Sequence, residues 1–282
     1  MAGTEIEIDN QVFIECRDFL VSGKKFQLFP LVGFEILKTI PVPQNLASYY
    51  ESENYISHTD SSKGITNRIY QLVKKYMLDQ KLNWIEALKS PGKLLEVGAG
   101  TGDFIFNAKK RGWQVSGVEP NKSARNLAIL KDLDLKNEIS KFDGEKFDVI
   151  CFWHVLEHIT DLEEEISRLK GLLNKNGILV IAVPNFKSYD AKYYREFWAA
   201  YDFPRHLWHF SQNGIKKLCS QFDFDLINTK PLIFDAYYVI LLSEKNKTGS
   251  SNPVKAFFCG WKSNQQAMKT SEYSSLVYFF QK

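Results

Sequence analysis

The sequence predicts an α/β fold in which a small β-rich appendage precedes a doubly wound, mostly parallel sheet of seven strands. The first observation is an apolar segment from Lys93 that leads into three glycines at every second position, Gly98, Gly100 and Gly102, and then into helical spacing. The second is the alternation of strand-length apolar runs with amphipathic segments, the order that a parallel sheet requires. A chain of 282 residues is long enough for one such domain with an appendage.

Composition and charge argue against several classes of protein. The net charge of +3 at neutral pH is too small to indicate nucleic-acid binding. The acidic N-terminus lacks the apolar core of a secretory signal, and no stretch approaches the roughly 18 apolar residues that span a bilayer. The four cysteines are scattered without C-x-x-C spacing, which argues against a zinc knuckle or a disulfide framework. We therefore expect a cytoplasmic protein with no nucleic-acid partner and no transmembrane segment.

The first 48 residues form the expected appendage. They alternate apolar and polar positions and end in the extended Pro-Val-Pro of residues 41–43, which predicts a few strands and a linker. The main domain then covers residues 49–282. It opens with a tyrosine-dense segment around Tyr55, which is either a surface loop or a cover for a ligand. Apolar positions with helical spacing between residues 65 and 88 predict two helices, or one broken helix, before the first strand.

The alternating part of the domain is expected between residues 93 and 185. Residues 147–152 and the wholly apolar residues 178–183 are its clearest later strands, the second of a kind buried on both faces. Thr160 and Glu163 have the spacing of a capping box that opens a helix. The other expected elements are a helix from Gly102 to Lys110, a strand that ends at Val118, a helix from Lys122 to Lys131 and a weak third strand near residues 138–141.

An aromatic segment follows at about residues 186–211. Tyrosine, tryptophan and phenylalanine crowd it, interrupted by arginine, aspartate and histidine. Because it is inserted after the fifth strand, we expect it to lie at the ligand-binding edge of the sheet as a lid. The elements expected beyond it are a helix capped by Ser211, strands at 224–227 and 276–280, a helix or strand at 234–242 and a polar, mobile segment at 245–255.

The glycine turn indicates a nucleotide site, because glycine lets the backbone approach a ligand where a Cβ would collide. Its third glycine comes one residue earlier than in the dinucleotide fingerprint. Glu96, two residues before the first glycine, would repel a pyrophosphate but suits a ligand that carries an ammonium and a sulfonium. Glu119 ends the second strand and can accept both ribose hydroxyls of an adenosine. These acids disfavour an NAD-dependent oxidoreductase, and the remaining alternative is a glycine turn with two incidental surface acids.

These features resemble the cofactor site of class I S-adenosylmethionine-dependent methyltransferases, which implies the Rossmann-like methyltransferase fold. Residues 152–159, Phe-Trp-His-Val-Leu-Glu-His-Ile, resemble the His-Val-Leu-Glu-His motif of a small-molecule, bacterial-type branch, and residues 172–177 and 183–185 match that branch too. The resemblance implies S-adenosyl-L-methionine as cofactor and S-adenosyl-L-homocysteine as product. The expected cofactor contacts are Glu96, Gly98, Ala99, Gly100, Gly102, Glu119, Pro120, Trp153, His154 and Tyr55. The acid that usually reads the adenine amine has no clear counterpart.

The motif after the fourth strand supplies the first catalytic candidates. His154 is either a general base or a residue that packs beside the cofactor. His154 and His158 have metal-ligand spacing, with Glu157 as a third ligand. The resemblance implies the same possibility, because some relatives of this branch use an acid and a histidine here for a divalent ion. No other ligands cluster in the sequence, so we expect no metal, and the alternative is that Glu157 and His158 pin the following helix.

Residues 202–211 resemble a Pro-Arg-His segment of bacterial methyltransferases. Within them, Arg205 can clamp an acceptor carboxylate or phosphate, and His206 or His209 can serve as the base. The alternative is an aromatic satellite core with a structural Arg–Asp pair. The catalytic candidates are therefore His154, His158 and His206.

The appendage carries a resemblance of its own over residues 21–26. Bacterial relatives with a similar segment carry paired cysteines that look like a zinc knuckle. Leu31 and Phe34 stand here where the later pair aligns, and the early pair is missing. We expect this degenerate knuckle to fold on apolar packing alone.

The resemblance implies methyl transfer to a small-molecule acceptor, such as a saccharide or a lipid-linked intermediate. A sulfonium already makes its methyl group electrophilic, so the protein has to position the acceptor, exclude water and provide a base where the acceptor bears a proton. The alternative is a non-catalytic partner or regulatory subunit that binds S-adenosylmethionine.

Overall fold

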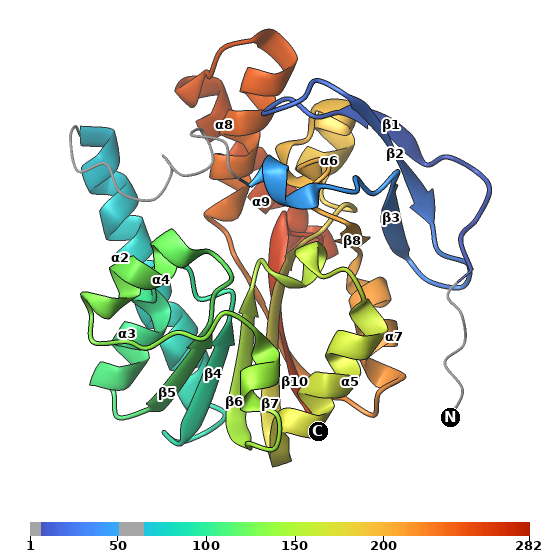
Figure 1. Cartoon of the computed structure of the whole chain (residues 1–282). Helices are drawn as coiled ribbons and strands as arrows, with labels where there is room; N and C mark the ends of the chain where they lie inside the picture. Colours follow the sequence, from blue (N-terminus) through green and yellow to red (C-terminus); the bar gives the residue numbers. More distant parts are fainter. Residues whose placement is uncertain (1–6, 51–64) are drawn as a thin grey trace.

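A computed structural model describes residues 7–50 and 65–282 of the chain, with side chains described from residue 71 onward in the second range. Figure 1 shows a sheet flanked by helices, with a second small sheet and a group of helices beyond one of its edges. Tyr55, expected at the cofactor, lies outside the described residues.

The main sheet has six strands in the order β5-β4-β6-β7-β10-β9. They are β4 (Lys93–Val97), β5 (Gln114–Val118), β6 (Phe147–Trp153), β7 (Leu173–Pro184), β9 (Asp225–Pro231) and β10 (Ser275–Gln281). The first four in the order are parallel, whereas β10 runs antiparallel between β7 and β9. Because parallel strands share one carboxyl edge, the residues that follow β4, β5 and β6 come together there.

Helices cover both faces of this sheet, which confirms the doubly wound prediction (Figure 1). One face carries α2 (Ile65–Glu86), α3 (Asp103–Lys110) and α4 (Lys122–Ile129), and the other carries α5 (Leu162–Leu172) and α7 (Gln212–Ser220). In β6, Val149 and Cys151 join the first core and Ile150 and Phe152 join the second. Alternation between two buried faces explains why the strands read as continuous apolar runs.

The third strand expected near residues 138–141 is wrong. A 3-10 helix, η2 (Ile139–Phe142), lies there, and beside β5 only an isolated parallel bridge joins Val118 to Lys136. Leu133 and Leu135 are buried just before this bridge, but the polar residues after them supply no apolar face for a strand. The described sheet therefore has six strands instead of seven.

Two helix starts test the expected caps. Ser211 is the N-cap of α7, and its hydroxyl oxygen accepts a hydrogen bond from the Gly214 amide at 3.0 Å. The start of α5 lies one residue beyond the expected Thr160, because the carboxylate of Asp161 accepts from the Glu164 amide at 2.9 Å.

The appendage forms a second sheet that also includes part of the aromatic segment. Strands β1 (Ile14–Arg17), β2 (Lys25–Pro30) and β3 (Ile36–Ile40) are antiparallel, and β8 (Trp208–Phe210) pairs with β3. Leu31 is buried in the core that covers the α5 face, and Phe34 packs against that core. The appendage is thus joined to the main domain by strand pairing and apolar packing across the boundary expected at residue 48.

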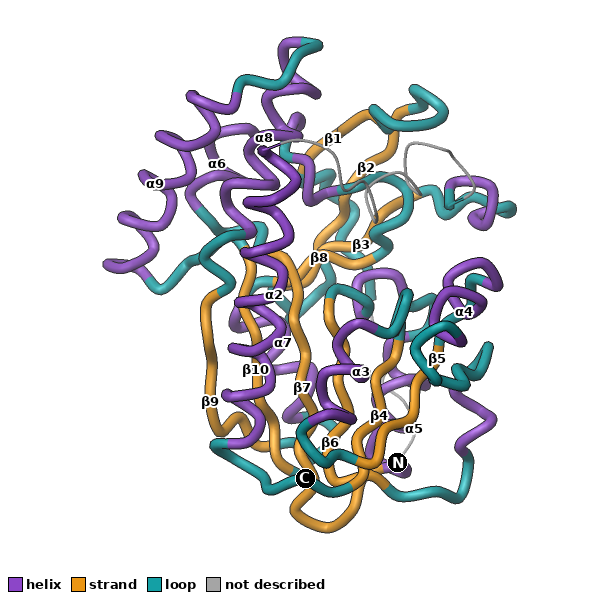
Figure 2. Tube along the Cα trace, turned by 90° about the vertical axis from the view of Figure 1, so that its left-hand side faces the viewer, coloured by secondary structure: helices purple, strands orange, loops and turns teal. Residues whose placement is uncertain are grey.

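The remaining helices stand beyond the carboxyl edge of the sheet, where Figures 1 and 2 show α6, α8 and α9 side by side. Their bounds, with the short 3-10 turns, are η1 (Leu46–Tyr49), η3 (Leu156–His158), α6 (Tyr189–Tyr194), η4 (Arg195–Phe197), η5 (Ala199–Tyr201), α8 (Asp235–Thr248) and α9 (Pro253–Thr270). The segment 245–255, expected to be polar and mobile, is helical except at residues 249–252, since α8 extends to Thr248 and α9 begins at Pro253. None of the helices described is both long and apolar enough to cross a membrane.

Candidate active site

The glycine turn after β4 has a backbone that only glycine adopts readily. Gly98, Gly100 and Gly102 have φ values of 72°, 55° and 79°. A Cβ at the first would collide with Val155, and a Cβ at the third would lie 2.6 Å from Leu133. A Cβ at Gly100 would meet nothing within 4 Å. The turn therefore packs at both ends and leaves open space at its middle glycine, where a ligand can approach the backbone.

Glu96 lies in β4, directly below this turn. Its side chain is 4% exposed, and Oε2 finds no hydrogen-bond donor among the described residues. Burial raises the pKa of Glu96 well above 4.5, although Lys81 and the backbone amide of Ile105 act to lower it. An unsatisfied buried carboxyl oxygen is costly. It fits a ligand that brings an ammonium group to this position.

Trp153 ends β6 and presents an aromatic face that already holds a cation. The Nζ atom of Lys81, from α2, lies 4.1 Å from the ring centroid. Burial lowers the pKa of Lys81, while Asp235 and Glu96 act in the opposite direction. The ring also meets Phe104 at 5.3 Å between centroids. A sulfonium would find the same kind of surface as the lysine does.

Glu119 follows β5 and is tied to the turn. Its Oε2 accepts a hydrogen bond from the Gly100 amide, and its Oε1 accepts one from the Asn121 amide, both at 2.8 Å. Ala99, inside the turn, donates its amide to the carbonyl oxygen of Val118 at 2.8 Å. Each carboxylate oxygen keeps a further lone pair, so Glu119 can still accept two hydroxyl groups. Pro120 follows it and is exposed.

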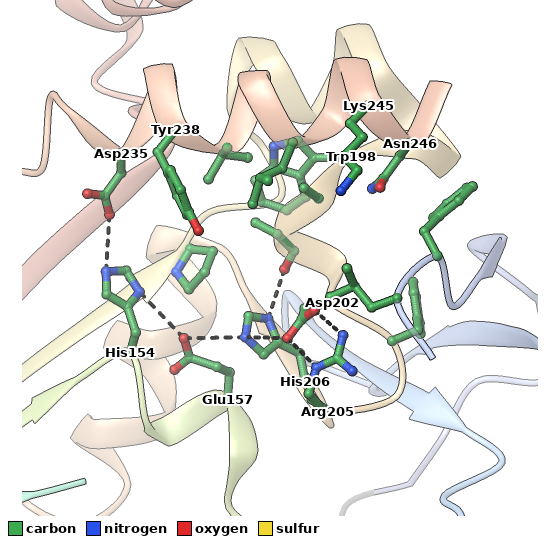
Figure 3. Close-up of a pocket in the computed structure, with 18 of the residues that line it drawn as sticks. His154, Glu157, Trp198, Asp202, Arg205, His206, Asp235, Tyr238, Lys245 and Asn246 are labelled. Carbon is green, nitrogen blue, oxygen red and sulfur yellow. Dashed lines mark hydrogen bonds and ion pairs between the residues drawn. The ribbon is translucent and has the colours of Figure 1, made fainter. Parts of the chain in front are cut away.

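A cavity of about 820 Å³ adjoins this edge of the sheet (Figure 3). It is lined by the segment after β1, by the residues after β6, by the aromatic segment and by α8. Its apolar wall includes Phe19, Leu20, Trp198, Val239 and Leu242. The volume is within the range of small-molecule sites, roughly 300–1,000 Å³. His154 lines the cavity and directly follows Trp153, so the cavity begins where the expected cofactor site ends.

His154 is held between two carboxylates (Figure 3). Its Nε2 lies 3.1 Å from Oδ2 of Asp235, and its Nδ1 lies 3.5 Å from Oε1 of Glu157. Burial disfavours the charged ring, but the interactions with Asp235 and Glu157 prevail and raise the pKa of His154 to about 9. At neutral pH the ring is therefore protonated. A protonated ring cannot accept a proton, so the geometry favours a positioning role over the base role.

His206, in the aromatic segment, differs from His154 because one of its ring nitrogens faces a carbonyl group and not a carboxylate. Its Nδ1 donates a hydrogen bond to the carbonyl oxygen of Ala200 at 2.8 Å, which leaves the lone pair of the neutral ring on Nε2. This Nε2 lies 3.9 Å from Oε1 of Glu157 and 3.9 Å from Oδ2 of Asp202. His206 therefore presents a proton acceptor beside two carboxylates that would stabilise the protonated ring.

Glu157 is the central carboxylate of this network. It is 1% exposed, and neither oxygen has a hydrogen bond of good geometry to another described residue. Burial would raise the pKa of Glu157, but His154, His206 and His158 hold it below 4.5. Atoms of Glu157, His158 and His206 that can ligate metals lie within 4.8 Å of one another. The trio considered from the sequence contained His154, which instead turns towards Asp235.

His158 is held in its neutral form. Burial and the neighbouring His206 lower the pKa of His158 to about 4. Its Nδ1 donates to the carbonyl oxygen of Arg205 at 3.0 Å, and the Tyr50 hydroxyl lies 3.0 Å from the same nitrogen. The ring thus joins the motif after β6 to the aromatic segment.

Arg205 and His209 take structural positions. The guanidinium of Arg205 makes a bidentate pair with Asp202, at 2.9 and 2.5 Å, as the alternative for this segment expected. The Thr39 hydroxyl donates to the carbonyl oxygen of His206 at 2.7 Å and lies 3.0 Å from Nε2 of His209. Burial lowers the pKa of His209 well below 6.5. His209 therefore fastens β8 to β3, whereas His206 faces the cavity.

Two functional neighbours, Lys81 and Asp235, were missed in the sequence. Lys81 carried a detectable signal, because it lies on the apolar stripe of its helix, beside Leu82 and one turn before Ile85, both fully buried. Asp235 carried no signal, since only the fold brings the start of α8 to His154.

A glycine turn above a buried acid, a second acid at the end of the next strand and a cavity beside them are features of the fold and site of a class I S-adenosylmethionine-dependent methyltransferase. The comparison with protein families agrees, since the methyltransferase domain model matches residues 68–229, more than half of the chain. The chain belongs to this methyltransferase-domain family, and the cofactor of such enzymes is S-adenosylmethionine.

Similar proteins include the ubiquinone biosynthesis O-methyltransferase of Rhodopseudomonas palustris strain TIE-1, 31% identical over 116 residues, which are 38% of this chain and 44% of that protein. An uncharacterized methyltransferase of Bacillus mycoides strain KBAB4 is 34% identical over 113 residues, 36% of this chain and 52% of that protein. The matches span about half the length of these curated relatives.

Solved structures share the fold. Magnesium protoporphyrin IX methyltransferase from Synechocystis PCC 6803, with bound SAH, superposes with a TM-score of 0.56 at 14% identity over 83% of this chain and 97% of that one. A SAM-dependent methyltransferase from Archaeoglobus fulgidus has a TM-score of 0.50 at 16% identity, over 74% and 94% of the two chains.

Proposed function

We propose that this protein transfers a methyl group from S-adenosylmethionine to an oxygen atom of a small-molecule acceptor, with His206 as the general base. The observation that carries the proposal is the geometry of His206, whose Nδ1 is used by the Ala200 carbonyl and whose Nε2 is thereby left to the cavity that begins at the end of β6. The printed name of the Rhodopseudomonas relative, an O-methyltransferase, supports an oxygen acceptor. We also propose that the chain belongs to the small-molecule, bacterial-type branch with the His-Val-Leu-Glu-His motif.

The residues divide the work between two places. Glu96 and the glycine turn would hold the methionine part of the cofactor, Glu119 the ribose, and Trp153 the sulfonium through its aromatic face. When bound, the cofactor supplies an electrophilic methyl group. In the cavity, His206 Nε2 takes the hydroxyl proton of the acceptor as its oxygen forms the new bond to carbon and the carbon–sulfur bond breaks. The resulting imidazolium lies between Glu157 and Asp202, which stabilise its charge.

The cavity wall supports a proposal for the acceptor class. Phe19 and Leu20 on one side and Val239 and Leu242 on the other are apolar, so the wall favours an acceptor with an apolar body. Of the two classes expected from the sequence, a lipid-linked or similarly apolar molecule fits this wall better than a bare saccharide. The aromatic segment, about residues 186–211, supplies the opposing surface and serves as the lid of the domain 49–282.

The proposal includes a cytoplasmic location and no nucleic-acid partner. Two observations support it: the four cysteines are all free thiols, and the net charge is small.

The test is cofactor binding followed by turnover. Calorimetry with S-adenosylmethionine should show binding, and incubation with a cell extract should release S-adenosylhomocysteine together with a methylated product. In the His206→Gln variant, binding should persist and release should stop, whereas Asn246→Ala, which alters a cavity residue away from the network, should keep turning over. Binding without release in the wild type would support the non-catalytic alternative. If S-adenosylmethionine does not bind at millimolar concentration, both the methyltransferase function and the non-catalytic alternative are refuted.

A further inference from the structure

Helix α9 has its large apolar residues on the outside. Its buried stripe consists of small residues, Ala256, Gly260, Ser263 and Ala267. The exposed side carries Val254, Phe257, Phe258, Trp261 and Met268, each between 54% and 69% exposed. Figure 2 shows α9 at the outer edge of the molecule, next to α6 and α8. An ordinary surface helix buries its large apolar residues and exposes its polar ones, so this arrangement needs an explanation.

Packing prevents α9 from turning this face inward. A Cβ at Gly260 would lie only 2.5 Å from the ring of Tyr237 in α8, so no larger residue fits at this contact. Ser263 donates its hydroxyl to the buried Asp190 of α6 at 2.8 Å, which fixes the rotation of the helix. Phe258 and Trp261 are therefore held outward by the fold.

The charges around this face have one sign. The 18 residues of α9 include no acidic residue, and its lysines, Lys255, Lys262 and Lys269, recur at every seventh position along one flank. Lys247 in the last turn of α8 adds a further positive charge near this helix, whereas Lys245 lines the cavity. The nearest acid of α8, Glu244, is buried and binds Lys255 at 2.8 Å. The face thus combines exposed phenylalanine and tryptophan with a row of lysines, which is typical of a helix that lies in a membrane interface.

We propose that the outer face of α9, formed by Val254, Phe257, Phe258, Trp261 and Met268 with its lysine row, docks on an anionic lipid bilayer. The aromatic and aliphatic side chains enter the boundary between headgroups and acyl chains, and Lys262 and Lys269 attract anionic headgroups, while Lys255 stays paired with Glu244. A second copy of the chain fits less well, because a two-fold contact through this face would bring two lysine rows together. The surface stands apart from the reacting groups, so the proposal holds whatever the acceptor.

Docking here has a consequence for the cavity. Helix α8 contributes Leu242 and Asn246 to the cavity wall and packs against α9, and Gly249 between the two helices lines the cavity as well. A bilayer under α9 therefore lies one helix away from the acceptor cavity. An acceptor anchored in the membrane would have a short path to it.

The test uses the full chain and vesicles of equimolar phosphatidylglycerol and phosphatidylcholine. The double variant Phe258→Ser with Trp261→Ser should partition onto them at least about tenfold more weakly than the wild type, because it removes two large apolar anchors. The matched control is Ile129→Ser with Leu130→Ser at the C-terminal end of α4, two side chains that are 63% and 82% exposed, and it should bind like the wild type. Lys262→Gln with Lys269→Gln should weaken binding about tenfold on these vesicles and leave binding to pure phosphatidylcholine unchanged.

A local measurement accompanies the partition. Lipids brominated in their acyl chains should quench part of the tryptophan emission of the wild type, and that part should be missing in Trp261→Phe. Equal partition of the wild type and the Phe258→Ser with Trp261→Ser variant would overturn the proposal. A different result would also overturn the proposal: the wild type does not bind vesicles but sediments as a dimer, and the Phe258→Ser with Trp261→Ser variant sediments as a monomer. That result would assign the face to contact with a second copy of the chain. Thermal unfolding of each variant establishes that the fold is intact.

Discussion

Two buried carboxyl groups mark the two parts of the site, the expected cofactor contacts and the cavity, and their surroundings shift their pKa values in opposite directions. Glu96, under the glycine turn, has a pKa raised well above 4.5 by burial, and Lys81 acts in the opposite direction. Glu157, in the cavity, is buried as deeply, but three histidines hold its pKa below 4.5. The difference lies in the neighbours, since burial alone would raise both values. In the part of the site around Glu96, called here the cofactor half, the cation that would stabilise the carboxylate has to come from the ligand. In the cavity around Glu157, the acceptor half, the protein itself supplies a cation, the protonated His154.

The largest effect should come from the acceptor half. His206→Gln removes the proton acceptor and keeps a side chain of similar size, so the turnover number should fall by about 10²–10⁴-fold. Affinity for S-adenosylmethionine should be unchanged, because His206 lies outside the glycine turn. Steady-state kinetics and calorimetry on the same preparation measure both quantities.

Metal content decides between two roles for His206. As a base, it should act without a divalent ion, so wild-type turnover should survive chelation by EDTA. Loss of turnover on chelation, restored by one divalent metal, would mean that Glu157, His158 and His206 act as metal ligands. The cation beside Glu157 would then be a metal ion and not a protonated histidine.

The next effect belongs to the cofactor half. Glu119→Ala removes charge-assisted hydrogen bonds to the ribose and should weaken S-adenosylmethionine binding by about 1–3 kcal/mol, or roughly 5–150-fold. Turnover at saturating cofactor should stay near the wild-type value. An unaltered dissociation constant in calorimetry would refute the ribose role.

Protonation of Glu96 gives a smaller, pH-dependent effect. Because its pKa in the free protein is raised, Glu96 carries a proton below that pKa, and a cationic cofactor favours the ionised form. Cofactor affinity should therefore increase as pH rises, by at most about tenfold per pH unit while one proton is released. Calorimetry in buffers of different ionisation enthalpy counts that proton. Glu96→Gln should abolish the proton release, and release that persists would place the titrating group elsewhere.

The residues expected at the cofactor could be named from the sequence because their signals are local. Glu96 and Glu119 each end a strand, and the glycine spacing around Gly100 reports the backbone it needs, so a linear pattern places them. The acceptor half depends on contacts between distant segments. His154 meets Asp235, and His206 meets Glu157, only after the aromatic segment folds back over the sheet. The separate histidines were visible in the sequence, but their protonation states were not, because neighbours from other elements set them.

The same reason explains the errors in the fold. Residues 138–141 have weak strand character. They form η2, and beside β5 the described residues make only the isolated bridge between Val118 and Lys136. The helix α9 was overlooked, since its outward apolar residues do not show the pattern of a helix that buries its large side chains. Its orientation follows from the close contact of Gly260 with Tyr237, which no local pattern contains.

The smallest effect tests whether Glu157 and Asp235 together keep His154 protonated in the cavity. His154 has a pKa of about 9 in the folded protein, above its ordinary value of 6.5, so its ion pairs stabilise the fold fully below pH 6.5 and lose that contribution as pH rises through 9. Glu157→Gln removes one of the two carboxylates and should lower the pKa of His154, leaving Asp235 as its partner. NMR titration of the His154 ring measures the shift, and urea unfolding of both proteins at several pH values should show that the loss of stability above pH 6.5 is smaller in the variant and is complete at a lower pH. A pKa that stays near 9 in Glu157→Gln would mean that Asp235 alone holds the charge, and that Glu157 belongs with His206 instead.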